Sequence, residues 1–390
     1  MIVKLINDRP VKIWTDYVEA SAMVQIENLA RLPFMYHHLA VMPDVHTGMG
    51  MPIGGVLACV DTVIPNAVGV DIGCGMCAVK TSIKTADIDY LEFRKRVLSK
   101  VREIIPLGMS HHKQPQDESL MPTGYDVDLM WVVKEQYQSA LRQVGTLGGG
   151  NHFIEFQRDE EDNLWIMIHS GSRNLGKMVG DYYNKKAMAL NKKWHSEVDP
   201  SMRLAFLPFH SPEFGEYWRE MQYCIDFALC NRKLMMSRIQ DVLESVFPQI
   251  EFEPMINIAH NYAAWENHFG KNVVVHRKGA TFAGKGTIGI IPGSQGTASY
   301  IVEGLGNPES FNSCSHGAGR VLSRTAAINQ LDMEAEVQRL NERGIIHAIR
   351  NKSDLQEAPS AYKDIDEVIN NQLDLIAVKT RLLPIAVIKG

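Results

Sequence analysis

The apolar residues of this chain follow helical spacing in some segments and strand-like spacing in others. Helices are indicated where apolar residues recur every three to four positions with polar residues between them. The expected helical ranges are 22–32, 90–105, 217–247 (one long helix or a pair), 333–343 and 365–375. Short apolar runs bounded by turn residues predict strands over 151–156 and 164–169.

Two stretches of the chain, residues 43–75 and 272–306, are rich in glycine together with proline or β-branched residues. This composition favours short strands and tight turns over helices. Helices and strands are mixed without a regular strand–helix–strand alternation, which predicts an α+β fold rather than a doubly wound parallel sheet. Because no repeat, low-complexity segment or long linker interrupts the chain, we expect one domain over residues 1–390.

The composition is that of a globular protein. Of the 390 residues, 45% are hydrophobic and 22% are charged, which excludes disorder, collagen-like repeats and a coiled coil. The 40 basic and 45 acidic residues leave a net charge of −5. A nucleic acid can therefore be bound only through a local basic patch.

Cysteine usage and hydropathy indicate where the protein works. Its six cysteines are too few and too scattered for a disulfide framework, so we expect reduced thiols. Residues 1–10 lack the charged and apolar regions of a signal peptide. No apolar run reaches the length of about 18 residues that a membrane-spanning helix requires. We therefore expect a soluble, cytoplasmic protein with no membrane contact.

Potential metal ligands recur in glycine-rich or strand-end positions. The segments are 70–75, 150–155, 168–173, 259–262 and 314–320. None has zinc-finger or His-Glu-x-x-His spacing, yet a thiolate, three or more imidazoles and a carboxylate can converge from them. Such a mixed donor set suits Zn²⁺, Mn²⁺ or Co²⁺ better than Mg²⁺ or Ca²⁺. Asp71 and Cys74, three residues apart, allow a bridging thiolate and two metals, although each residue alone is more often structural.

Glycine-rich loops form a second signal, because their backbone amides can approach phosphates closely. These loops are residues 147–151, 284–286, 291–296 and 316–320. None is a Walker A loop or a dinucleotide-binding G-x-G-x-x-G, and a plain β-turn explains any one of them equally well. The residues alone thus indicate no more than metal-assisted phosphate chemistry.

The same segments resemble a known family. The matching segments are 42–46 (Met-Pro-Asp-Val-His), 69–75 (Gly-Val-Asp-Ile-Gly-Cys-Gly), 150–155 (Gly-Asn-His-Phe-Ile-Glu), 169–173 (His-Ser-Gly-Ser-Arg), 277–280 (Arg-Lys-Gly-Ala), 315–320 (Ser-His-Gly-Ala-Gly-Arg), 361–366 (Ala-Tyr-Lys-Asp-Ile-Asp) and 387–390 (Val-Ile-Lys-Gly). In this order, along essentially the whole chain, they are similar to the RtcB-type RNA ligases. The resemblance implies a large mixed domain with a central metal- and nucleotide-binding cleft. It also implies a GTP- and Mn²⁺-dependent ligase that joins RNA 3′-phosphate or 2′,3′-cyclic phosphate ends to 5′-hydroxyl ends.

The resemblance also assigns roles to residues. Two Mn²⁺ ions would share Cys74, with His169 and His260 completing one site and Asp71 and His152 the other. His316 matches the histidine that becomes guanylylated, as a neutral imidazole can attack phosphorus. The matching nucleotide positions are Asn151, Glu155, Asn261, Ser294, Gly317, Ala318, Gly319, Arg320, Tyr362 and Lys389.

The implied reaction passes GMP from His316 to the RNA 3′-phosphate, after any cyclic phosphate has been opened, and the 5′-hydroxyl then displaces GMP. Basic candidates for contacts with the RNA backbone are Arg173, Arg277, Lys278 and Lys285, and a solvated surface explains them equally well. We expect a monomer; a protein activator is neither indicated nor excluded. Departures from the family pattern at 47–50, Gln295 and 110–117 leave the RNA-end preference open, between tRNA splicing and repair of cleaved RNA.

Two other functions compete with the ligase. A hydrolase can use the same metal centre to open cyclic phosphates or to cleave phosphodiesters, but it needs no nucleotide-accepting histidine in the 315–320 segment. A catalytically silent RNA-binding or translation-associated factor has no need for the full set of metal ligands. Both features of the sequence favour the ligase.

Overall fold

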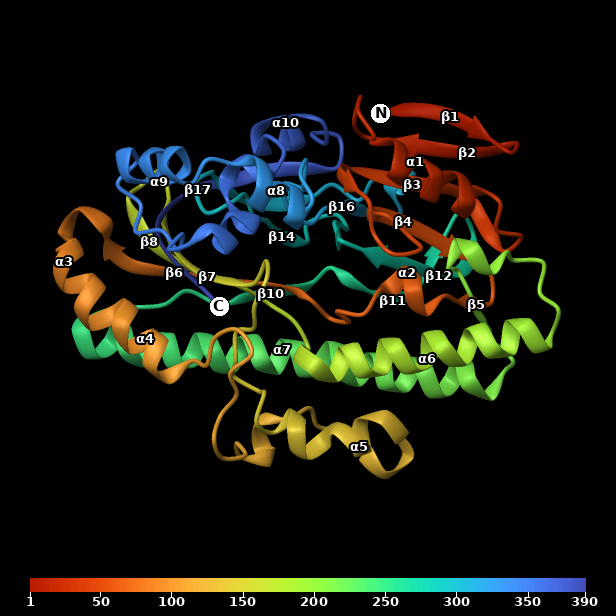
Figure 1. Cartoon of the computed structure of the whole chain (residues 1–390), viewed down its shortest axis with the longest axis horizontal. Helices are drawn as coiled ribbons and strands as arrows, with labels where there is room; N and C mark the ends of the chain where they lie inside the picture. The colour runs from red at the N-terminus through yellow and green to blue at the C-terminus, as the bar shows by residue number, and fades with distance from the viewer.

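Two largely antiparallel sheets form the centre of the molecule (Figure 1). The computed structural model describes residues 1–390. The six-stranded sheet has the order β1 (Ile2–Ile6), β2 (Arg9–Ile13), β3 (Met35–His46), β4 (Ile53–Cys59), β12 (Lys271–Lys278) and β11 (Asn261–His268). The seven-stranded sheet has the order β10 (Ile256–Ala259), β6 (Gly75–Lys84), β8 (Asn163–Ser170), β7 (Phe153–Arg158), β17 (Ile376–Lys389), β15 (Ser299–Gly304) and β14 (Ile288–Ile291). Two short pairs complete the strands, β13 (Ala280–Phe282) with β16 (Ser313–Ser315) and β5 (Thr62–Val63) with β9 (Leu207–Pro208).

Helices cover the sheets, and two long ones lie side by side below the sheets in Figure 1. These two are α6 (Arg173–Lys193) and α7 (Pro212–Val246). The other helices are α1 (Ala20–Ala30), α2 (Pro65–Val68), α3 (Tyr90–Phe93), α4 (Ser99–Ile104), α5 (Trp131–Ala140), α8 (Arg324–Gln330), α9 (Met333–Glu342) and α10 (Ile365–Asn370). No helix combines the length and the apolar character needed to cross a bilayer.

The α+β prediction is confirmed, since every strand pairing except β2 with β3 is antiparallel. The expected range 217–247 is one continuous helix, α7. The expected helix 90–105 is instead α3 and α4 joined by a π-helical turn, Arg94–Leu98. Helix α10 ends at Asn370 rather than at residue 375, and two residues later the buried Gln372 side chain hydrogen-bonds Ser315.

The sequence patterns missed α6, although this helix has 21 residues. Its buried face repeats every four residues, at Leu175, Val179, Tyr183 and Ala187. Glycines interrupt that face and weaken the helical signal. Helix α6 is therefore stabilised by its packing on α5 and α7 more than by local propensity.

Strand ends from both sheets meet at one point. Strand β10 ends at Ala259 in the seven-stranded sheet and β11 begins at Asn261 in the other, so His260 lies at the crossing. Gly75, the first residue of β6, pairs there with both Ala259 and Ser170. A Cβ on Gly75 would lie 2.0 Å from the Ile258 carbonyl oxygen, so only glycine permits this approach.

Asn231, a fully buried residue of α7, joins two loops beside this crossing. Its Oδ1 accepts hydrogen bonds from the amides of Gly145 (2.7 Å) and Thr146 (3.1 Å). Its Nδ2 donates to the Thr146 and Gly171 carbonyls and to Ser170 Oγ. The amide thus ties the loop before β7 and the loop after β8 to the long helix.

We expect Asn231→Ala to lower the free energy of unfolding by about 2–4 kcal/mol, because it strands buried backbone groups without partners. Urea denaturation followed by circular dichroism measures the change. The matched control is Asn341→Ala on the exposed face of α9, which should shift stability by less than about 0.5 kcal/mol. Equal effects of the two substitutions would contradict the role given to Asn231.

Candidate active site

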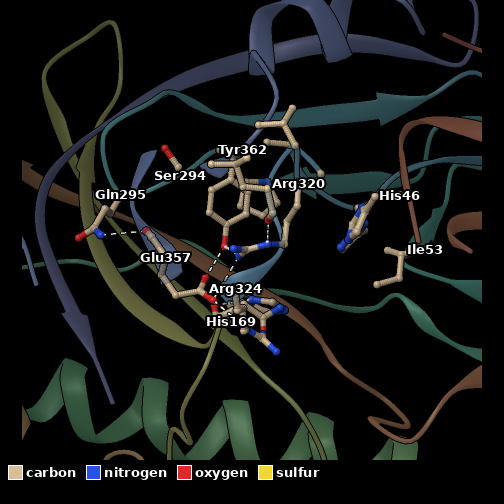
Figure 2. A pocket seen from close by; sticks show the side chains of 18 of the residues that line it. His46, Ile53, His169, Ser294, Gln295, Arg320, Arg324, Glu357 and Tyr362 are labelled. Atoms are coloured by element: carbon tan, nitrogen blue, oxygen red, sulfur yellow. Dashed lines mark hydrogen bonds and ion pairs between the residues drawn. The ribbon is translucent and has the colours of Figure 1, made fainter. Parts of the chain in front are cut away.

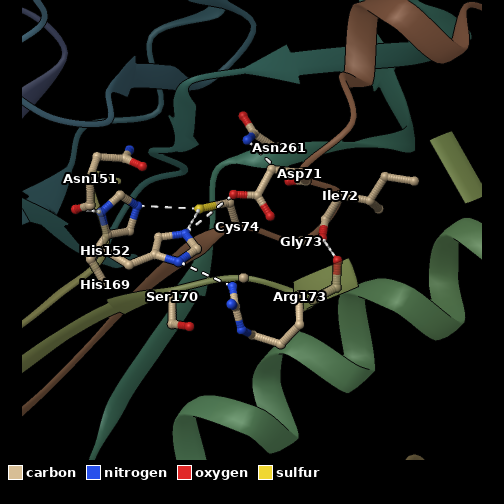
Figure 3. Close-up of polar contacts among 12 residues, drawn as sticks. Asp71, Ile72, Gly73, Cys74, Asn151, His152, His169, Ser170, Arg173 and Asn261 are labelled. Atoms are coloured by element: carbon tan, nitrogen blue, oxygen red, sulfur yellow. Dashed lines mark hydrogen bonds and ion pairs between the residues drawn. The ribbon is translucent and has the colours of Figure 1, made fainter. Parts of the chain in front are cut away.

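The five predicted metal ligands, termed the metal cluster, lie together at the crossing between the sheets. Cys74, His152, His169 and His260 are buried, whereas the Asp71 side chain is 37% exposed. Figure 3 shows Asp71, Cys74, His152 and His169. Cys74 Sγ is 3.3 Å from His169 Nε2 and 3.5 Å from His152 Nε2. His152 Nε2 is 3.3 Å from Asp71 Oδ2, and His169 Nε2 is 3.4 Å from His260 Nε2. The thiol therefore lies between a carboxylate–imidazole pair and a pair of imidazoles.

Backbone carbonyls orient two of the imidazoles. His152 Nδ1 lies 3.0 Å from the Leu147 carbonyl oxygen, and His169 Nδ1 lies 3.1 Å from that of Asn151. A carbonyl oxygen only accepts, so each Nδ1 carries the proton. Each Nε2 then presents a lone pair to Cys74, as a metal-ligating histidine requires.

The donor atoms of Cys74, His152 and His169 all lie within 4.8 Å of one another. Burial lowers the pKa of His169 and of His260 well below the usual range, so both imidazoles are neutral. Several lone pairs directed into one buried volume repel each other unless a cation lies among them. His260 Nδ1 is also buried without a partner. The cluster fits a borderline divalent metal with sulfur, nitrogen and oxygen ligands.

Asp71 keeps its negative charge in this cluster. Burial opposes ionisation, but a protonated His152, through its Nε2–H hydrogen bond and its charge, lowers the pKa of Asp71 to about 2, with smaller contributions from Cys74 and Arg173. A metal bound at His152 Nε2 would displace that proton and supply the positive charge in its place. Burial raises the pKa of the Cys74 thiol, and the charge of Asp71 adds to that rise. A bound cation favours the thiolate, so metal binding at Cys74 releases a proton.

His316 follows strand β16 and lies against the metal cluster, with its ring centre 4.7 Å from that of His260. Its Nδ1 is 2.6 Å from Oδ2 of Asp44, and its backbone amide donates to the same oxygen at 3.1 Å. Asp44 is fully buried on β3. Because the carboxylate holds the Nδ1 proton, Nε2 is left with a free lone pair and no partner within the chain.

A cavity of about 560 Å³ opens beside His316 (Figure 2). Its lining includes, among the predicted nucleotide-binding residues, Asn151, Glu155, Ser294, Gly317, Ala318, Gly319, Arg320, Tyr362 and Lys389. His169 and His316 line it as well, so the cavity reaches the metal cluster. Gly319 has φ +73°, and a Cβ there would lie 2.2 Å from the Asp44 carbonyl oxygen, so glycine lets the loop pass close to β3.

Charged groups buried in the cavity wall differ in protonation. Burial raises the pKa of Glu155 to about 8, and Gln157 and Lys389 offset only part of the rise. Burial also opposes ionisation of Glu357, but Lys389, Tyr362 and Arg320 outweigh it and lower the pKa of Glu357. Lys389 Nζ lies 3.7 Å from Glu357 Oε2. The cavity thus places a neutral carboxyl group at pH 7 near an ionised carboxylate.

Glu357 organises one wall of the cavity. Its Oε1 lies 3.3 Å from Arg320 Nη1 and 3.3 Å from Arg324 Nε, and its Oε2 accepts a hydrogen bond from the Tyr362 hydroxyl. The Arg320 guanidinium lies over the Tyr362 ring at 4.9 Å. Gln295, one of the departures from the family pattern, donates to the Glu357 carbonyl at 3.0 Å.

The structure corrects two of the predicted RNA contacts. The Arg277 side chain is fully buried and forms an ion pair with Glu266, so it cannot lie on a basic surface. Lys278 is 8% exposed, and its ammonium donates to the carbonyls of Met49 and Asn66. The two residues are adjacent on β12 and so point to opposite faces of the sheet, and both faces are buried there.

The remaining predicted residues lie in different surroundings. The Arg173 guanidinium lies 3.3 Å from His152 Nδ1, beside the metal cluster. Asn261 does not line the cavity; its Oδ1 accepts from the Gly279 amide and its Nδ2 donates to the Asp71 carbonyl. Lys285 is exposed in the loop between β13 and β14, away from the cavity lining.

Sequence reasoning gave no role to Asp44, Arg324 or Glu357. A charged residue within the apolar run of β3 was the available signal for Asp44, since a buried carboxylate needs a partner. Glu357 and Arg324 lie in polar surroundings of the sequence that offer no comparable signal.

We expect Co²⁺ added to the metal-free protein to produce a sulfur-to-cobalt charge-transfer band, because the Cys74 thiol is among the donors. The band should disappear in Cys74→Ala. The matched control is Cys77→Ala, because Cys77 lies three residues further along the chain, on β6, and is buried in an apolar cluster. Absorption spectroscopy during a Co²⁺ titration measures both; a band that persists without Cys74 would contradict the assignment.

The chain is similar to known ligases along its whole length. It matches the family model described as "tRNA-splicing ligase RtcB" over residues 25–139 and 122–390. It is 39% identical to the RNA-splicing ligase RtcB of Escherichia coli K12, over 98% of each chain. It is 33% identical to the tRNA-splicing ligase RtcB of Methanococcus maripaludis, over 94% of this chain and 91% of the relative. The chain therefore belongs to the RtcB family.

Proposed function

We propose that this protein is a GTP- and Mn²⁺-dependent RNA ligase that joins RNA 3′-phosphate or 2′,3′-cyclic phosphate ends to 5′-hydroxyl ends. The observation that carries the proposal is His316, whose Nδ1 is held by buried Asp44 while Nε2 is free between the cavity and the metal cluster. A hydrolase using the same metal cluster has no need for such an oriented nucleophile. Family membership agrees with the proposal, and a single-domain monomer remains our prediction.

Two Mn²⁺ ions, when bound, would supply positive charge to phosphate oxygens and lower the pKa of bound water. Cys74 would serve both ions, with His169 and His260 on one side and Asp71 and His152 on the other. The observed order of the donors, with the thiol between the two pairs, supports this division.

In the first step His316 Nε2 attacks the α-phosphorus of GTP. A P–N bond forms, the bond to the β-phosphate oxygen breaks, and pyrophosphate leaves. Asp44 holds the Nδ1 proton and stabilises the positive charge that develops on the ring. Arg320 at the cavity wall is placed to neutralise phosphate charge.

In the second step an oxygen of the RNA 3′-phosphate attacks the same phosphorus, the P–N bond breaks, and the RNA end carries GMP through a pyrophosphate bond. In the third step the 5′-hydroxyl oxygen attacks the RNA phosphorus and GMP leaves. The product is a 3′–5′ phosphodiester. His316 returns to its starting state after each turnover, so the chain needs only one nucleophile.

Guanine selection is assigned to Glu155, Tyr362 and Lys389. An ionised Glu155 can accept hydrogen bonds from guanine N1–H and its exocyclic amine, which adenine does not offer in that arrangement. Tyr362 offers a ring for stacking. Lys389, which lies beside the carboxyl groups of Glu357 and Glu155, can donate to the guanine carbonyl oxygen.

The decisive test is mass spectrometry of the Mn²⁺-loaded protein after incubation with GTP. We expect a covalent GMP adduct on His316, absent from His316→Ala and absent with ATP. Asp44→Asn should slow adduct formation by about 100-fold or more, because it removes the charge that stabilises the imidazolium. No adduct in fully loaded wild-type protein would refute the autonomous ligase.

We also expect GTP binding to depend on Glu155 ionisation. Since the pKa of Glu155 is about 8, the carboxyl is neutral below that pH and becomes able to accept both guanine donors above it. Affinity for GTP should therefore rise as the pH increases through about 8.

Glu155→Gln should flatten this pH dependence and reduce the preference for GTP over ATP by about tenfold or more. The control is Glu303→Gln, a surface residue paired with Lys379 far from the cavity lining. Equilibrium binding of both nucleotides across the pH range measures the effect. A pH profile unchanged by Glu155→Gln would contradict this assignment.

A further inference from the structure

Three arginines on one side of the molecule have no counter-charge. They are Arg94 in the π-helical turn after α3, Arg102 in α4 and Arg350 after α9. None forms an ion pair, and none of the three guanidiniums donates a hydrogen bond within the chain. Figure 1 shows α3 and α4 at the same end of the molecule as α9.

Packing holds the segments that carry Arg102 and Arg350 against the same strand. Val101 and Ile105 flank Arg102 and lie in the apolar cluster that also contains Ile385 and Ile388 of β17. Ile346 packs on the same cluster, and its amide donates to the Ile385 carbonyl at 3.0 Å. The chain around Arg350 is therefore held against the same strand that α4 covers.

Arg102 indicates that the three arginines form one charged site rather than scattered surface side chains. Its Nε is buried without a hydrogen-bond partner. Burial lowers the pKa of Arg102, and the nearby charges of Arg350 and Arg94 lower it further. The nearby Asp354 carboxylate accepts from the Arg350 backbone amide and forms no ion pair with a guanidinium. Like charges held together without an ion pair are unfavourable, and an external anion relieves both the repulsion and the unmet donor.

The chain segments that carry Arg102 and Arg350 lead to the cavity wall. The chain leaves α4 and reaches Gly108, which packs so closely on the C-terminal residue that a Cβ on Gly390 would lie 2.3 Å from the Gly108 amide nitrogen. Lys389, the residue before it, lines the nucleotide cavity. Arg324 lies at the cavity rim, and its helix α8 packs on the segment Lys352–Glu357 that follows Arg350.

We propose that Arg94, Arg102 and Arg350 bind phosphates of the substrate RNA strand outside the cleft. The inference rests on the proposed ligase function and adds a strand-binding surface to it. The planar guanidinium fork suits phosphate oxygens, and unpaired arginines need no rearrangement before they bind. These three arginines supply the RNA contacts that the buried Arg277 and Lys278 cannot make. They give a protein of net negative charge a local positive surface for a polyanion.

The test compares the triple variant Arg94→Gln, Arg102→Gln, Arg350→Gln with the wild type. The probe is a single-stranded RNA of about 20 nucleotides that ends in a 3′-phosphate. We expect its Kd at about 0.1 M salt to rise by about tenfold to a hundredfold, and the slope of log K against log salt to fall by about 2. Glutamine keeps most of the side-chain stem, so the packing of α4 is largely preserved.

The matched control replaces three exposed, unpaired lysines of α6 at the other end of the molecule, Lys185, Lys192 and Lys193, by glutamine. It makes the same change in net charge, so an equal loss of RNA binding would overturn the proposal. A two-nucleotide RNA 3′-phosphate is too short to reach the three arginines. The triple arginine variant should therefore guanylylate it at the wild-type rate. An equal loss with this short substrate would also overturn it.

The GMP adduct on His316 separates this inference from the proposed function, since it forms without RNA. An adduct in the triple variant at wild-type yield shows that the variant is folded and competent. With the adduct present, unchanged binding of the long RNA refutes the arginine surface alone. Absence of the adduct from the wild type refutes the ligase function instead.

Discussion

Backbone hydrogen bonds between residues 71–75 and 259–261 hold the whole site together. The Gly73 amide donates to the Asn261 carbonyl at 2.8 Å, and the His260 amide donates to the Cys74 carbonyl at 2.8 Å. Gly75 continues this contact as a strand pair with Ala259. Because the crossing chain joins the two sheets, these bonds place ligands from distant segments within a few ångströms. A side chain at Gly75 would push the two segments apart and separate Cys74 from His260.

Three buried carboxyl groups around the cavity have different partners, and the partners separate their tasks. Asp44 orients His316, Glu357 is ionised among basic groups, and Glu155 stays neutral until about pH 8. Neighbouring carboxyl groups with well-separated pKa values are typical of sites that need an acid, a base and a recognition element together. Asp44 holds His316 in place before any ligand enters, which lowers the cost of reorganisation during phosphoryl transfer, whereas Glu155 has still to lose its proton at neutral pH.

The glycine-rich loops and the strand ends with their ligands were predictable, because histidine, cysteine and aspartate beside glycine is a local pattern. Asp71 and Cys74 are three residues apart, so the sequence allowed them to share one site. The pairing of Asp44 with His316 was not predictable, since 272 residues separate them and only the contact of β16 with β3 brings them together. The helix α6 was missed for a related reason, since its stability comes from its neighbours rather than from its own residues.

By itself the sequence determined the α+β class, the long helix α7 and several shorter helices, the strands β7 and β8, and the residue types available as metal ligands, because these depend on local spacing and side-chain chemistry. Only the tertiary structure decided which basic residues face solvent. The sequence suggested Arg277 and Lys278 as phosphate contacts, but both side chains are buried on β12. Arg94 and Arg102 look like the polar face of a helix until Arg350 is brought beside them. Charge depends on residue type, whereas exposure and pairing depend on contacts between segments far apart in the chain.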